Sequence, residues 1–100
     1  MASAVAIGIL RVVLHLPESG SLKSKRMVVS SLLSRIRNQF QVAAAEVGER
    51  DRWQLAELAI CCVSSDASHA GEVLNRVLAF VEARAADAVL ADVSTEILRV

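Results

Sequence analysis

Residues 4–16 read AVAIGILRVVLHL and are followed by the turn sequence PESG at residues 17–20. This run is too short and too rich in Val and Ile for a helix, so it predicts a strand that stops at the turn. Ser21 can then cap a helix that runs to about Phe40. One face of that helix is apolar at the expected spacing, through Val29, Leu32, Leu33, Ile36 and Phe40.

The rest of the chain repeats this order with one additional strand. Residues 42–49 predict a second strand, residues 48–52 (GERDR) a polar hairpin loop, and residues 55–63 a third strand. A cap at Ser65 or Asp66 begins a second helix to about residue 85, and residues 89–100 alternate as a fourth strand. The order β-α-β-β-α-β predicts one α+β domain over residues 1–100 with a ferredoxin-like arrangement. We expect a four-stranded antiparallel sheet in the order 4-1-3-2, with both helices on one face.

The alternation of side chains along each strand predicts which residues face away from the helices. On the first strand this open face carries Arg11 and His15. On the third and fourth strands it carries Glu57, Ala59, Cys61, Val63, Leu90, Asp92, Ser94, Glu96 and Leu98. Its apolar part consists of Val5, Ile7, Ile9 and Val63. Exposed apolar area of this kind usually meets a partner, and the commonest partner of a small domain is a second copy. These four residues are therefore candidates for a homodimer interface.

The net charge of zero hides a separation of charges along the chain. Residues 1–40 contain six cations and one anion, whereas the remaining sixty residues contain five cations and ten anions. Three of the cations lie in the first turns of the first helix, where the helix dipole favours anions. The predicted topology brings the hairpin loop and the turn at residues 85–88 to the same end. The candidates for binding an anion or RNA there are Lys23, Lys25, Arg26, Arg50, Arg52 and Trp53.

Trp53 and the basic residues each allow two interpretations. The indole of Trp53, the only tryptophan, can stack on an unpaired base or cover an edge of the core. The cations can hold phosphates or form a solvated surface.

Motifs for catalysis, metals and cofactors are absent from the sequence. The four glycines form no phosphate-binding loop, the two histidines lie far apart, and Cys61 and Cys62 are neighbours whose side chains would point to opposite faces of a strand. We therefore expect no enzyme activity, no metal and no cofactor. A small hydrolase with an acylphosphatase-like fold is an alternative that rests on fold analogy alone. The N-terminal residues lack a signal-peptide pattern, so we expect a cytoplasmic protein without a membrane partner.

Four segments carry a family resemblance: SLKSKR (21–26), SLLSRIRNQF (31–40), VAAAEVGERDRWQLAEL (42–58) and VSSDASH (63–69). Together they are similar to the YlxP-like family of small bacterial proteins of unassigned function. The resemblance implies a ferredoxin-like fold and a cytoplasmic bacterial protein, and it supplies no catalytic residues. Family members are commonly encoded beside genes for transcription elongation, translation initiation and ribosome maturation, which implies a connection with RNA. Ser24 stands where the family often has Asp, and this makes the first segment more positive.

Two hypotheses about function follow. The first is a non-enzymatic cytoplasmic accessory protein that associates with RNA or a ribosomal subunit through the basic end of the first helix. The alternative is a protein-interaction or regulatory module that acts as a homodimer through the apolar open face.

Overall fold

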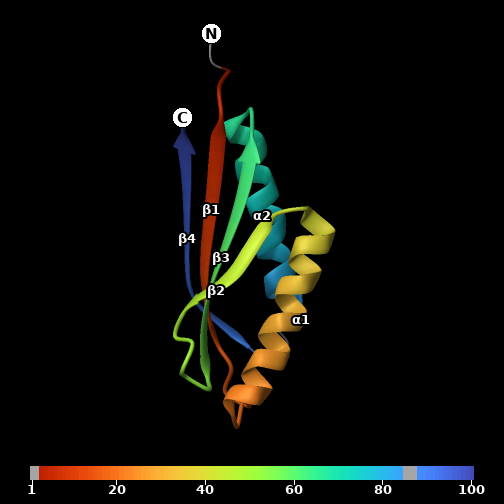
Figure 1. Ribbon diagram of the computed structural model, residues 1–100, viewed down its shortest axis with the longest axis vertical. Coiled ribbons are helices and arrows are strands. Elements are labelled where there is room, and N and C mark those ends of the chain that lie inside the picture. The colour runs from red at the N-terminus through yellow and green to blue at the C-terminus, as the bar shows by residue number, and fades with distance from the viewer. Residues whose placement is uncertain (1–2, 85–87) are drawn as a thin grey trace.

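Within residues 3–84 and 88–100, which the computed structural model describes, four strands form one antiparallel sheet in the order β2-β3-β1-β4 (Figure 1). The elements are β1 (Ala6–His15), α1 (Leu22–Phe40), β2 (Ala43–Gly48), β3 (Leu55–Ser64), α2 (Ala67–Arg84) and β4 (Val89–Arg99). Both helices lie on the same side of the sheet. The predicted α+β class, element order and strand order are confirmed. Apart from Ala88, the predicted turn at residues 85–88 lies outside the described residues.

Both helices begin at capping residues that the sequence predicts. Ser21 has an extended backbone, with φ −164°, and its side-chain oxygen accepts the backbone N–H of Ser24 at 3.0 Å. Asp66 caps α2, because its Oδ1 accepts the backbone N–H of Ser68 at 2.9 Å. At the other end of α1, Gln41 adopts the left-handed conformation with φ 54°, and its N–H donates to the carbonyl oxygen of Arg37 at 2.9 Å.

The core lies between the sheet and the two helices. Helix α2 packs closely on β1 at Gly8, where an added Cβ would lie 2.8 Å from Leu74 Cδ1. A glycine at this position thus allows the helix to pack directly on the strand. The fully buried large apolar residues are Leu10, Val12, Leu14, Ile36, Leu58, Ile60, Leu74, Val77 and Val81.

The predicted open face is confirmed on β1 and β3 but is wrong in one part of β4. The pairing of β1 with β4 shifts between Val13, which is opposite Asp92, and Leu14, which is opposite Leu90. Ala91 is therefore an extra residue, a β-bulge that reverses the alternation on its N-terminal side. As a result Leu90 packs against the core instead of facing outward, and Val89 is exposed.

The molecule is elongated, about 53 Å long and 23 by 22 Å across. The two helices are staggered along this length, with α2 nearer the chain termini and α1 nearer the opposite end (Figure 1). The loop between β1 and α1 and the loop between β2 and β3 both lie at that opposite end. This is the end where the sequence places the basic candidates.

Candidate functional site

Backbone hydrogen bonds join the two loops at the basic end. The N–H of Leu16 donates to the carbonyl oxygen of Gln54 at 2.8 Å, and the side chain of Gln54 donates to the carbonyl oxygen of Pro17 at 3.1 Å. The hairpin loop, residues 49–54, is thus held against the loop that precedes α1. The juxtaposition that the topology predicts is present.

Lys25 makes the central contact between α1 and the hairpin loop. Its side chain is fully buried (0% exposed), and Nζ donates to the carbonyl oxygens of Glu49 at 2.6 Å, Leu55 at 2.9 Å and Arg50 at 3.3 Å. Glu46 Oε2 lies 2.9 Å from the same nitrogen. An ammonium group has three N–H bonds, and the carbonyls take them. The carboxylate is therefore a charge partner, and its buried Oε2 accepts no hydrogen bond from the described residues.

The prediction that Lys25 binds an external anion is wrong, because its ammonium group is enclosed and surrounded by oxygen atoms. A signal for this burial exists in the sequence. Lys25 precedes Val29 by four residues and thus continues the apolar stripe of α1 toward its N-terminus. Glu46 lies on β2 opposite the buried Leu58, which places it on the helix side of the sheet. A lysine and a glutamate at two inward positions predict a buried ion pair.

Lys23, Arg26 and Arg50 are exposed at the same end. Arg26 and Arg50 line a hollow of about 440 Å³ together with Glu46 and Asp51. The charge of Glu46 is compensated by Lys25. The hollow consequently offers two guanidinium groups against the single exposed carboxylate of Asp51.

Arg52 and Trp53 lie on the other side of the hairpin loop, toward the open face of the sheet. Arg52 forms an ion pair with Glu49 at 3.5 Å. The side chain of Trp53 is not buried in the core, since 54% of the residue is exposed. Together with His15 and Gln54, these two residues line a second hollow of about 390 Å³. The loop therefore carries Arg50 on one side, and Arg52 with an accessible indole on the other.

The apolar candidates gather on the open face near the chain termini. Ile7 of β1 is opposite Val63 of β3 and Leu98 of β4, so these three side chains form a row across the sheet. Val63 is 72% exposed. Ile9 follows on the same face of β1, and Val5 is also exposed. The predicted interface residues thus lie together, and Leu98 extends the surface that they form.

The sheet also carries an ion pair and two free cysteines. Arg11 on the open face pairs with Glu57 at 3.2 Å. Burial raises the pKa of the Cys62 thiol above its ordinary value, and the adjacent Cys61 adds to this rise. The described residues contain no group of three or more His, Cys, Asp or Glu side chains placed to hold a metal ion. Among these residues there is also no helix with the length and hydropathy of a membrane span.

Comparison with known proteins gives a family and a fold. The family model described as "Protein of unknown function (DUF503)" matches residues 7–95. "Uncharacterized protein YlxP" of Bacillus subtilis (strain 168) is 42% identical over 65 residues, which are 65% of this chain and 71% of the relative.

Two solved structures show the same fold at low sequence identity. The de novo designed protein Foldit4 is 13% identical with a TM-score of 0.51, and the match covers 96% of this chain and 97% of that one. An amidase of the hydantoinase/carbamoylase family from Burkholderia phymatum is 10% identical with a TM-score of 0.56. The match covers 99% of this chain but only 29% of the amidase.

Proposed function

Since the chain belongs to the DUF503 family of proteins of unknown function, we propose that it is a non-enzymatic cytoplasmic accessory protein that associates with RNA or a ribosomal subunit. The basic end binds the RNA. Lys23, Arg26 and Arg50 hold backbone phosphates on the α1 side of the hairpin loop. Trp53 stacks on an unpaired base on the opposite side.

The observation that carries this proposal is the attachment of the hairpin loop through Lys25. A binding loop gains affinity when it is ordered before the ligand arrives, because less conformational entropy is lost on binding. The buried ammonium group holds the carbonyl oxygens of Glu49, Arg50 and Leu55, on both sides of Trp53. Arg50 and the indole are therefore presented on a loop that is fixed to α1, beside Lys23 and Arg26.

The balance of charges at this end predicts modest, salt-dependent binding. Two of its cations, Lys25 and Arg52, are paired with Glu46 and Glu49. Lys23, Arg26 and Arg50 have no ion-pair partner within the described residues and can hold phosphates, so the affinity falls steeply with salt and sequence preference is weak.

Trp53 provides a direct measurement because it is the only tryptophan of the chain. Its fluorescence is expected to be quenched in a saturable way by single-stranded RNA at low salt. In anisotropy titrations of labelled RNA, Trp53→Phe, which keeps a smaller aromatic ring, should bind more tightly than Trp53→Ala, whose affinity falls by about fivefold or more. Quenching by free nucleotides alone, or equal RNA affinity of all three proteins, would exclude stacking by this residue.

A second candidate function rests on the row of Val63, Ile7 and Leu98. Such a row exposes apolar area on the open face near the chain termini, and a second copy can bury it in a symmetric dimer. The protein would then act as an interaction or regulatory module.

Ile7→Glu should convert a dimer into a monomer without unfolding it. Ala45→Glu, on the outer strand β2 of the same sheet, is the matched control. Sedimentation at 0.1 and 1 M salt separates this candidate from the first, because a dimer held by apolar contacts is insensitive to salt.

A further inference from the structure

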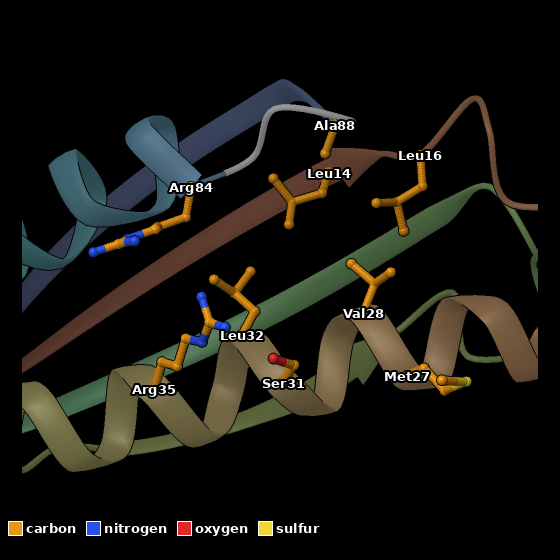
Figure 2. Close-up of a pocket in the computed structure, with 9 residues that line it drawn as sticks. All are labelled: Leu14, Leu16, Met27, Val28, Ser31, Leu32, Arg35, Arg84 and Ala88. Atoms are coloured by element: carbon orange, nitrogen blue, oxygen red, sulfur yellow. The ribbon is translucent and has the colours of Figure 1, made fainter.

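The two helices are staggered along the sheet (Figure 1). A groove lies between α1 and the C-terminal end of α2. The groove has a volume of about 340 Å³, and its floor is formed by the buried side chains of Leu14 and Leu16. In Figure 2 these two leucines face Val28 and Leu32 of α1 across the groove. A hollow of about 280 Å³ continues it past Leu16 and Val28 toward the loop before α1.

Apolar side chains are unusually exposed at the rim of the groove. Met27 is 66% exposed and Val28 is 51% exposed, and they are neighbours on α1. The thioether of methionine is flexible and adapts to ligands of different shape. This combination of an apolar floor and an apolar rim is typical of small-molecule sites.

Two arginines form one end of the groove. Arg35 comes from α1 and Arg84 from α2, and Figure 2 shows their guanidinium groups on the same side of the lining residues. Neither arginine has an ion-pair partner within residues 3–84 and 88–100. Arg84 is oriented by the ring of Phe80, whose centroid lies 5.0 Å from the guanidinium carbon. A carboxylate, Glu18, lines the continuing hollow, which Arg84 also lines.

From this arrangement we infer that the groove binds a small amphipathic oxyanion, an apolar chain or ring with one terminal carboxylate or phosphate. The anionic group lies between Arg35 and Arg84, whose planar donors suit either oxyanion. The apolar body lies over Leu14 and Leu16 and covers Val28.

The test uses the full chain and four probes below their aggregation concentrations. Decanoate and decyl phosphate carry both features, decanol lacks the charge, and adenosine monophosphate keeps a phosphate but has a polar body. We expect saturable one-to-one binding of the first two by calorimetry, with amide shifts in nuclear magnetic resonance confined to the residues that line the groove. Decanol and adenosine monophosphate should each bind at least about tenfold more weakly. Whichever of decanoate and decyl phosphate binds with the higher affinity shows whether the groove prefers a carboxylate or a phosphate.

Variants separate charge from apolar contact. The double substitution Arg35→Gln/Arg84→Gln should lower the affinity for decanoate by about tenfold or more and leave the affinity for decanol unchanged. Arg76→Gln, an exposed arginine of α2 that does not line the groove, is the matched control and should have no effect. Val28→Asp should abolish binding of both amphiphiles. Absence of saturable binding, equal affinity for decanol, tight binding of adenosine monophosphate, or an unaffected double variant would each overturn the inference.

Discussion

Lys23, Lys25 and Arg26 come from one short segment of sequence, yet their surroundings differ completely. Lys23 and Arg26 are exposed, whereas the ammonium group of Lys25 is enclosed by three carbonyl oxygens and a carboxylate. A charge count along the sequence treats the three alike. Their position on the helix separates them, because only Lys25 falls on the apolar stripe of α1.

Removal of the Lys25 charge should therefore be costly for folding. Lys25→Met leaves Glu46 buried without a charge partner and removes the donor from three carbonyl oxygens. We expect the free energy of unfolding to fall by about 3–5 kcal/mol, and Lys23→Met, in the same turn of the helix, to change it by less than about 0.5 kcal/mol. Urea denaturation followed by circular dichroism measures both. The double variant Lys25→Met/Glu46→Gln should recover part of the loss, and equal stability of the two single variants would contradict the structural role of Lys25.

The left-handed conformation of Gln41 gives a prediction of opposite sign. A residue with a Cβ atom is strained at φ 54°, and glycine is not. Gln41→Gly should raise the free energy of unfolding by about 0.5–1 kcal/mol. Gln39→Gly, two residues earlier within α1, should lower it by up to about 1 kcal/mol. Thermal denaturation of the two variants provides the measurement, and a loss of stability in both would show that the end of α1 has another conformation.

Each predicted helix and strand is present in the structure, because the hydrophobic patterns are long and the caps are clear. The inward and outward sets of β1 and β3 were predictable for the same reason: both are central strands with regular alternation. On β4 the alternation breaks at Ala91, and no residue of the bulge, such as a glycine, indicates it in the sequence. The predicted strand order was sufficient to place the loop between β1 and α1 next to the loop between β2 and β3. The burial of Lys25 required its helical position and that of Glu46 to be considered together.

The contact between α2 and β1 depends on Gly8. The Cβ atom of an alanine there would approach Leu74 Cδ1 to 2.8 Å, and Leu74 is itself buried. Gly8→Ala should lower the free energy of unfolding by about 1–3 kcal/mol through overpacking. Gly71 is the matched control on α2, since no atom lies within 4 Å of an added Cβ and alanine favours the helix. Gly71→Ala should stabilise the protein by up to about 1 kcal/mol, and equal effects of the two substitutions in denaturant titrations would contradict this packing.

For the whole molecule, the long axis separates two surfaces. The termini and the apolar row of Ile7, Val63 and Leu98 lie toward one end, and the loops with the basic residues and Trp53 lie at the other. A dimer through the apolar row would leave the basic loops free. Both proposed surfaces can therefore function in the same protein, and each has its own dependence on salt.

Neutralising Lys23, Arg26 and Arg50, which have no ion-pair partner in the part of the chain that the structure describes, tests the proposed function most directly. The measurement is the affinity of Lys23→Gln/Arg26→Gln/Arg50→Gln for single-stranded RNA, by fluorescence anisotropy over a series of salt concentrations. Arg76→Gln/Arg99→Gln, on other parts of the molecule, is the control. If these cations hold phosphates, the triple variant binds at least tenfold more weakly at low salt and the slope of log affinity against log salt decreases by about 2. An unchanged affinity and slope, with the control equal to the triple variant, would contradict RNA binding by this end.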